Sequence, residues 1–362
     1  MAAPIPTLPF SFKHTPQLPE LLAELNCSLV VTTYQAGKVM VLSSDGERMI
    51  QLPRTFEEPM GLAVHDNRMA VATKYAIVML ANEPRLAGNY PRQPDTYDAL
   101  FVPRSVHHSG RLAVHDMVWT EKGLVGVNTL FSCLFQLDPN FSFRPVWKPP
   151  FVSALAPEDR CHLNGLALKD GEPRYATALG TTDSAGGWRE NKESGGVLLD
   201  LPSGEVILGG LAMPHSPRVY DGVVYALLSS TGEVITIDVE RGQYEVIHKV
   251  NGFARGLARH GDYLFIATSK FRKQHTFGDL GLVSDKEAFC GITMLHLPSG
   301  AFVADLRYLR SCEEIYDIQV LPGLRRPGLL GLHDNSYRMA LSAPEMTFWA
   351  REREEAAEGD AQ

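Results

Sequence analysis

The stretch "NGLALKDGEPRYATAL" at residues 164–179 places two short apolar runs on either side of a Lys-Asp-Gly turn. Short apolar runs separated by Gly, Asp and Pro are typical of antiparallel β-strands. The same strand–turn–strand unit begins at five other residues: Met60, His115, His215, Arg255 and Tyr316. Six copies of one unit predict a repeat architecture.

The spacing of the copies indicates which architecture. Successive units begin 55, 49, 51, 40 and 61 residues apart. Two further strand-like runs follow each of the middle four units, as in "EVITIDV" at 233–239 and "QYEVIHKV" at 243–250. Four antiparallel strands in every 40 to 60 residues predict an all-β fold, a β-propeller.

The two ends of the chain are expected to close the ring. The N-terminal runs "SLVVTTYQ", "KVMVLSS" and "RMIQLP" resemble a blade that lacks its first strand, and "EIYDIQVL" near the C-terminus would supply it. We therefore predict six blades, with seven as the alternative, because "GLLGLHDN" at 328–335 is left over. The predicted propeller covers residues 26–345, between an N-terminal extension (1–25) with a short helix at 17–25 and an acidic tail (346–362).

The composition and charge of the chain argue against several classes of partner and location. The 362 residues carry a net charge of −8 and no cluster of Lys and Arg, which argues against nucleic acid or an anionic membrane as a partner. The N-terminus lacks the basic and apolar stretches of a signal peptide, and no apolar run approaches the roughly 20 residues that span a bilayer. The five cysteines have no CxxC spacing, so we expect reduced thiols in a cytoplasmic protein.

Three histidines fall at matched positions of consecutive units, where the first strand of a blade enters the central channel. They are His115, His162 and His215. We expect their imidazole nitrogens to point into one shared space and to bind a divalent transition metal, with Zn, Mn, Fe and Cu not distinguished. Asp317 is the fourth candidate for the metal site. The alternative is that each histidine binds water or backbone and holds no ion.

Other polar residues are expected at the same rim. Arg255 would bind a substrate carboxylate, and Glu58 or Glu314 would act as general base. Asn164, Trp188 and Arg189 would contact the substrate. Two insertions, 181–194 with Trp188 and Arg189 and 271–288, are expected between second and third strands above this rim, as lids or as ordinary surface loops.

Two functions remain open at this point. The first is a metal-dependent enzyme that acts on a small, anionic substrate by hydrolysis, lysis or oxidation. The second is a propeller that binds a small ligand or a peptide without catalysis. Metal content after purification would distinguish them.

Several phrases resemble an uncharacterised bacterial family, a conserved hypothetical protein or domain of unknown function. They include "TTYQAGKV", "NTLFSCL", "EDRCHLNGLAL", "MPHSPR" and "EIYDIQVLPGLRRP", and the resemblance spans about residues 26–328. It implies that the rim segments with His162, His215, Arg255 and Glu314 belong to the pattern of the family. It implies no activity.

"LNGLAL" is also similar, more distantly, to six-bladed lactonases of the gluconolactonase and regucalcin type. That resemblance implies a calcium ion held by Glu, Asn and Asp, and Glu58 and Asn164 match the first two. Arg255 stands where a carboxylate would be sought, and histidines prefer softer metals, so calcium is disfavoured. Some propeller polysaccharide lyases bind manganese through histidine, and the histidine ring resembles that arrangement.

Overall fold

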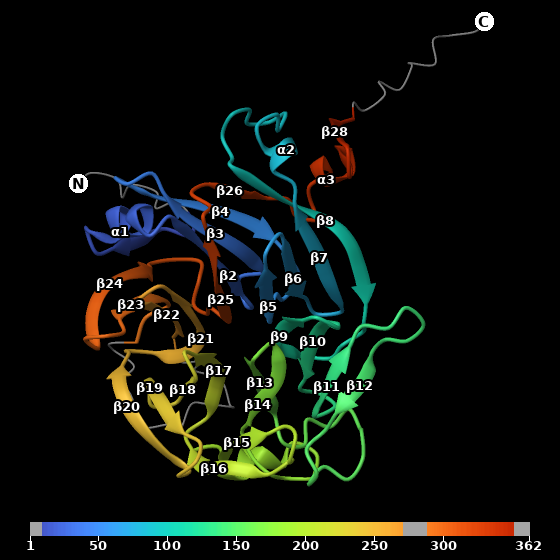
Figure 1. Cartoon of the computed structure of the whole chain (residues 1–362), viewed down its shortest axis with the longest axis vertical. Coiled ribbons are helices and arrows are strands. Elements are labelled where there is room, and N and C mark those ends of the chain that lie inside the picture. Colours follow the sequence, from blue (N-terminus) through green and yellow to red (C-terminus); the bar gives the residue numbers. More distant parts are fainter. Residues whose placement is uncertain (1–8, 271–287, 351–362) are drawn as a thin grey trace, which may run out of the picture.

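A computed structural model describes residues 9–270 and 288–350 of the chain. Six antiparallel sheets surround a common axis, as Figure 1 shows. We number these blades in the order of their innermost strands along the chain. The structure is therefore a six-bladed β-propeller, as predicted.

Blades 1 to 3 are each built from consecutive strands. Blade 1 contains β5 (Leu62–His65), β6 (Arg68–Ala72), β7 (Ala76–Asn82) and β8 (Ala99–His108). Blade 2 contains β9 (Val114–Thr120), β10 (Gly123–Asn128), β11 (Cys133–Gln136) and β12 (Arg144–Trp147). Blade 3 contains β13 (Leu163–Lys169), β14 (Glu172–Ala178), β15 (Gly196–Asp200) and β16 (Val206–Leu211). In each blade the first strand lies nearest the axis.

Blades 4 and 5 repeat this order, and blade 6 joins the two ends of the chain. Blade 4 contains β17 (Pro214–Tyr220), β18 (Val223–Leu228), β19 (Glu233–Asp238) and β20 (Gln243–Lys249). Blade 5 contains β21 (Phe253–His260), β22 (Tyr263–Ser269), β23 (Gly291–His296) and β24 (Ala301–Tyr308). Blade 6 contains β25 (Asp317–Pro322), β2 (Cys27–Thr33), β3 (Lys38–Ser44) and β4 (Met49–Thr55).

The ring closes as the sequence predicts. β25 pairs antiparallel with β2, with Asp317 opposite Thr32 and Pro322 opposite Cys27. Two short strands extend other blades: β1 (Phe12–His14) pairs with β24, and β26 (Pro327–Leu329) pairs in parallel with β8. The leftover run "GLLGLHDN" thus begins at the outer edge of blade 1 and makes no seventh blade.

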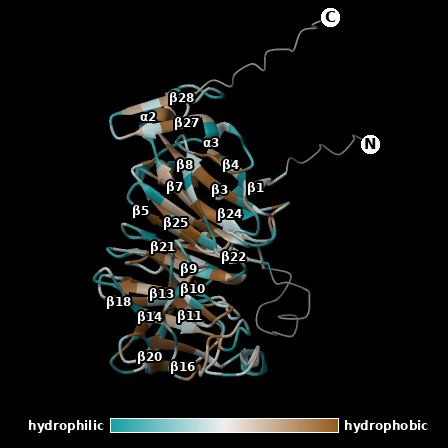
Figure 2. Cartoon of the chain, turned by 90° about the vertical axis from the view of Figure 1, so that its right-hand side faces the viewer, coloured by the Kyte–Doolittle hydropathy of each residue, from teal (hydrophilic) through white to brown (hydrophobic). Residues whose placement is uncertain are grey.

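Short elements surround the ring. The predicted helix near the N-terminus is α1 (Leu18–Glu24). A hairpin of β27 (Ala340–Ala343) and β28 (Met346–Trp349) packs with α2 (Pro84–Ala87) and α3 (Ser336–Met339) outside blade 1, as Figure 2 shows. β28 occupies the start of the range expected for the acidic tail, and residues 351–362 lie outside the described part. No helix among the described residues is long and apolar enough to cross a membrane.

The hydrophobic core lies between blades. Val30 and Val41 of blade 6 pack with Leu62 and Met69 of blade 1 in one such cluster. Other clusters join each remaining pair of neighbouring blades in the same way. Because the middle strands are buried on both faces, β2 reads as an uninterrupted buried run. This packing holds the inner strands, and the side chains at their entry, in fixed positions around the axis.

Candidate functional site at the channel mouth

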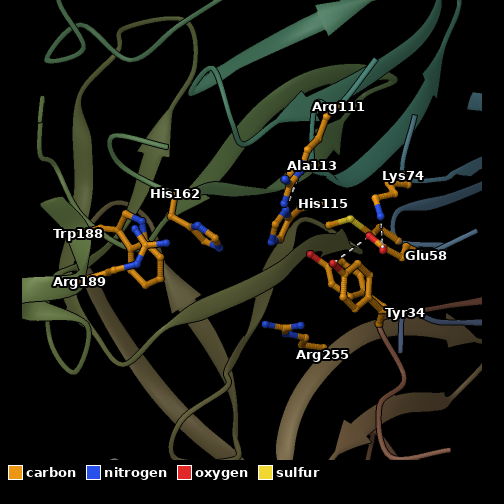
Figure 3. A pocket seen from close by; sticks show the side chains of 12 residues that line it. Tyr34, Glu58, Lys74, Arg111, Ala113, His115, His162, Trp188, Arg189 and Arg255 are labelled. Carbon is orange, nitrogen blue, oxygen red and sulfur yellow. Dashed lines mark hydrogen bonds and ion pairs between the residues drawn. The ribbon is translucent and has the colours of Figure 1, made fainter. Parts of the chain in front are cut away.

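A pocket of about 210 Å³ lies where the inner strands begin, and we call it the mouth pocket. Figure 3 shows its lining, which includes His115 and His162 with Lys74, Arg111, Arg189 and Arg255. These side chains come from blades 1, 2, 3 and 5, so the ring brings together residues from distant parts of the chain. The sequence predicted this convergence for His115, His162, Glu58, Trp188, Arg189 and Arg255, all of which line the pocket.

His115 and His215 have the same local geometry in blades 2 and 4. The Nδ1 atom of His115 lies 2.9 Å from the carbonyl oxygen of Ala113 and 2.8 Å from the hydroxyl of Thr129. In blade 4, Nδ1 of His215 lies 3.0 Å from the carbonyl oxygen of Met213 and 2.8 Å from the Ser229 hydroxyl. Each carbonyl belongs to a residue with positive φ, 53° for Ala113 and 56° for Met213, which turns it toward the ring.

These contacts set the protonation of both rings. A carbonyl oxygen only accepts hydrogen bonds, so Nδ1 carries the proton and Nε2 keeps a lone pair. Burial, reinforced by neighbouring positive groups, lowers the pKa of His115 and of His215 well below 6.5. Both imidazoles are therefore neutral near pH 7. The buried Nε2 of His215 has no hydrogen-bond partner within the described residues.

His162 is oriented by a carboxylate that the sequence reasoning missed. Its Nδ1 lies 2.9 and 3.0 Å from the two carboxylate oxygens of Asp159. Asp159 also accepts a hydrogen bond of 3.0 Å from Trp188 Nε1 and one of 3.5 Å from Arg189. The predicted loop 181–194 forms the 3-10 helix η1 (Gly187–Asn191) and packs Trp188 on His162, with ring centroids 4.4 Å apart. The spacing Asp-x-x-His in "EDRCH" was the available signal for this pair.

The three histidine rings are neighbours. The centroid of His115 lies 4.8 Å from that of His162 and 6.5 Å from that of His215. His115 and His162 line the mouth pocket, and His215 is buried beside His115. Within residues 9–270 and 288–350, no group of three or more His, Cys, Asp or Glu side chains is arranged to hold a metal ion. The metal site therefore stays a prediction.

The two expected general bases are both ion-paired. Glu58 accepts hydrogen bonds from Lys74 at 2.8 Å and from the Tyr34 hydroxyl at 3.2 Å. The bond from Lys74 lowers the pKa of Glu58, which makes it a weaker base. Glu314 accepts a bond of 3.0 Å from Arg255, and both side chains are buried. Arg255 lies between the rings of Phe253 and Tyr316, at 4.8 and 4.9 Å from their centroids.

Arg111 is a further lining residue that the sequence reasoning missed. It is exposed at the rim, and within the described residues it makes no hydrogen bond or ion pair. It stands on the loop before β9, four residues ahead of His115. Nothing in its surroundings, "HSGRLAVHD", distinguishes it from an ordinary surface arginine.

Below the mouth pocket, a second ring of residues narrows the channel. It consists of the residue that follows each entry position, and we call it the neck: Gly61, Asp116, Gly165, Ser216, Gly256 and Asp317. Beyond it, a pocket of about 310 Å³ opens at the other end of the channel. The neck separates the two pockets.

Side chains of blades 2, 4 and 6 tie the neck to the next blade. Asp116 accepts a hydrogen bond of 3.0 Å from the amide of Leu166, and Asp317 accepts one of 3.0 Å from the amide of Leu62. Ser216 accepts the equivalent bond, 2.9 Å, from the amide of Gly256. The hydroxyls of Thr129, Ser229 and Thr32 donate bonds of 2.6 Å to carbonyls of the same neighbouring blades. Alternate blades therefore differ, and the six blades form three similar pairs.

Arg218 lies between the two neck carboxylates. Its guanidinium is 2.8 Å from Asp116 and 3.8 Å from Asp317. Asp317 was predicted at the metal site, but its oxygens accept the amides of Leu62 and Ile318. Asn164 was predicted to contact substrate, but it bridges Pro214 and Thr177 and does not line the mouth pocket. Both side chains join blades, so their proposed functional roles find no support in these contacts.

The second predicted lid, 271–288, lies almost wholly outside the described residues. Its roles therefore stay predictions.

The geometry defines the class of the protein as a six-bladed propeller with a polar mouth. Residues 16–330 match the model of a family described as a domain of unknown function, DUF4915, and the chain belongs to that family. The resemblance to an uncharacterised family is thus confirmed. None of the curated proteins compared with the chain matches it.

Solved structures share the fold. The chain is similar to one in a crystal structure of a nidogen/laminin complex, with a TM-score of 0.54 and 10% identity over 82% of this chain and 99% of that chain. A second similar structure, a protein of unknown function from Bacteroides caccae, has a TM-score of 0.48 and 10% identity over 82% of this chain and 98% of that one. At this identity the first likeness shows the fold alone.

Proposed function

We propose that the mouth pocket binds a small anionic molecule. The observation that carries this proposal is a local excess of cations in an acidic chain. Lys74, Arg111, Arg189 and Arg255 line the pocket with a single carboxylate, Glu58, although the whole chain has a net charge of −8. Such a local field attracts anions and raises their concentration at the site.

The ion pairs around the pocket indicate how much negative charge a ligand would bring. Lys74 is neutralised by Glu58, Arg255 by Glu314 and Arg189 in part by Asp159. Arg111 then remains as the lining cation that makes no ion pair or hydrogen bond in the described part of the chain, although its charge contributes to lowering the pKa of Glu58. A guanidinium binds a carboxylate through two parallel hydrogen bonds, so one ligand carboxylate at Arg111 would complete the balance.

The rest of the pocket suits polar groups of the same ligand. His115 and His162 both have Nδ1 engaged, so their Nε2 atoms are the ring nitrogens left to contact a ligand. The neutral Nε2 of His115 accepts a hydrogen bond from a hydroxyl or receives its proton. The volume of about 210 Å³ is below that of pockets for drug-sized ligands, which favours a small hydroxylated or keto acid.

The test is binding of gluconate and pyruvate, measured by isothermal titration calorimetry on the full chain. The variant Arg111→Met removes the guanidinium and should lower the affinity for the bound acid by at least about 10-fold. The reason is that charge-assisted hydrogen bonds contribute about 1.5–3 kcal/mol. Arg144→Met makes the same change on the exposed outer strand β12 and should leave the affinity unchanged. Equal affinity in Arg111→Met and wild type, or preference for a neutral sugar, would contradict the proposal.

A metal-dependent enzyme is the second candidate, supported by the histidine cluster. Three neighbouring imidazoles with Nδ1 engaged present Nε2 as the remaining donor, which is the form that binds a transition metal. A divalent ion held there would polarise a carbonyl or activate water. His115, His162 and His215 would hold it, and Arg111 would orient the anion.

Metal content tests this second candidate directly. After dialysis against one equivalent of Zn²⁺ or Mn²⁺, wild type should retain one ion per chain by elemental analysis, and His162→Ala should retain none. His107→Ala removes a histidine at the far end of β8 and should retain the ion. If wild type retains no metal, the metal-dependent enzyme is contradicted and the anion-binding protein remains.

A further inference from the structure

Two buried thiols lie next to each other in blade 5 and the segment that follows it. The sulfur atoms of Cys290 and Cys312 are 3.5 Å apart. All five cysteines of the chain are buried and unbridged, and a sulfur–sulfur hydrogen bond joins this pair. A disulfide needs a separation of about 2.05 Å, so the two sulfurs must approach by roughly 1.5 Å.

The hydrogen bonds show how the pair is arranged. The Cys312 thiol donates to the carbonyl oxygen of Glu314 at 3.6 Å. The hydrogen between the two sulfurs therefore belongs to Cys290, and a lone pair of Cys312 faces Cys290.

Both cysteines lie outside the regular strands. Cys290 directly precedes β23, and Cys312 lies in the irregular segment 309–316 between β24 and β25. In that segment Ser311 has a φ of 65° and Leu309 is half exposed. Irregular segments of this kind open locally more easily than strands do, which admits a small reagent to a buried thiol.

We propose that Cys290 and Cys312 form a reversible disulfide when a peroxide is the oxidant. One thiolate attacks a peroxide oxygen and becomes a sulfenic acid, with release of hydroxide. The second thiolate then attacks that sulfur, the S–O bond breaks, and the S–S bond forms. Two thiols and one hydrogen peroxide thus give one disulfide and two water molecules. Burial raises the pKa of Cys290, so the reaction is slow at neutral pH and faster in mild alkali.

The position of the bond gives it a consequence at the mouth pocket. Cys312 stands two residues before Glu314, which pairs with Arg255, and four residues before Tyr316, which lines the pocket. A bond from Cys312 to the start of β23 would tether the segment 309–316 to blade 5. This inference does not depend on which ligand the mouth pocket binds.

The experiment uses the full chain, reduced, desalted and treated with 1 mM hydrogen peroxide at pH 8. Free thiols are then alkylated under denaturing conditions and counted by intact mass. Wild type should lose two of its five alkylation sites together, dithiothreitol should restore both, and peptide mapping should join the peptides of Cys290 and Cys312. Amide hydrogen exchange in 309–316 should slow at least about threefold in the oxidised protein.

Matched variants separate this pair from the other thiols. Cys27→Ser removes a buried cysteine of blade 6 and should leave the disulfide intact. Cys290→Ser should show no reversible loss of two sites. Five free thiols in treated wild type, or a mapped bond between other cysteines, would overturn the proposal. Mapping on wild type decides the question even if Cys290→Ser fails to fold.

Discussion

The mouth pocket and the neck lie next to each other along the channel, and both contain polar residues. In the neck, the carboxylates of Asp116 and Asp317 accept hydrogen bonds from backbone amides of the next blade and pair with Arg218. In the mouth pocket, the guanidinium of Arg111 and the Nε2 of His115 and His162 make no hydrogen bond within the described residues. One ring holds blades together, and the other presents unused hydrogen-bonding groups.

The difference between the neck and the mouth pocket follows from their different levels along the channel. At the neck, the inner strands approach so closely that a Cβ on Gly61 would lie 3.2 Å from the backbone of His115 and Asp116. Neighbouring inner strands are in contact at this level, and the buried polar side chains of the neck bond to another blade. The residues directly before the neck include His115, Arg255 and Tyr316, and these line the mouth pocket. Polar residues along this channel therefore bond between blades in the neck and line an open space at the mouth.

The largest expected effect comes from the neck carboxylate. In Asp116→Asn, the new amide group would place N–H donors against the amide of Leu166 or Met117. Asp317, 3.8 Å away, would then be the only carboxylate left to Arg218 within the described residues. We expect the free energy of unfolding to fall by about 3 kcal/mol, because one partner of a buried ion pair is lost. Urea denaturation followed by tryptophan fluorescence measures this. A loss below about 1 kcal/mol would mean that the neck does not hold the blades together.

A glycine of the neck should give the next largest effect. In Gly165→Ala, the added methyl would lie 2.3 Å from Cδ of Pro217 and 2.4 Å from the Thr177 hydroxyl. We expect about 2 kcal/mol of destabilisation from this overpacking. Gly88→Ala meets no atom within 4 Å and serves as the control, with a change within about 0.5 kcal/mol. Similar stability for the two variants would contradict the close approach of blades 3 and 4.

The pH dependence of stability tests the neutral histidines beside the pocket. Burial lowers the pKa of His115 and His215, so the native state binds fewer protons than the unfolded chain below about pH 6.5. The free energy of unfolding should therefore fall as the pH drops from 7 to 5, by up to about 1.4 kcal/mol per pH unit for each histidine. His215→Gln, compared with wild type by urea denaturation in metal-free buffer, should show a shallower dependence. Identical slopes in the two proteins would count against a buried neutral His215.

The smallest effect on stability should come from the mouth pocket. Arg111→Met removes an exposed side chain that makes no hydrogen bond or ion pair within the described residues, so the free energy of unfolding should change by less than about 0.5 kcal/mol. The same variant should lose anion affinity, as proposed above. A destabilisation comparable to that of Asp116→Asn would show that Arg111 belongs with the neck and not with the ligand site.

Much of the candidate site was predictable because propeller blades repeat. The alignment of the six strand entries predicts that His115, His162 and Arg255 lie on one rim. The same alignment assigned Asp317 and Asn164 to the site, although the structure uses both between blades. Asp159 was missed because it lies outside the aligned unit and reaches His162 only through a turn with positive φ at both residues, 50° and 51°.

A finer repeat was also present in the chain. In blades 2 and 4 a hydroxyl follows the histidine by 14 residues, at Thr129 and Ser229. This two-blade period was not visible from apolar spacing, since it depends on which side chains bond to the next blade. It becomes clear once the blades are placed side by side.

The sequence by itself determined the propeller and the closure of the ring by the two ends of the chain, and it favoured six blades over seven. It did so because strand alternation and turn residues are local properties that repeat in every blade. Only the tertiary structure decided which polar residues line the mouth pocket and which bond to another blade. That choice depends on contacts between strands of different blades. Because those strands are far apart in the sequence, the local pattern of neither strand reveals the contact.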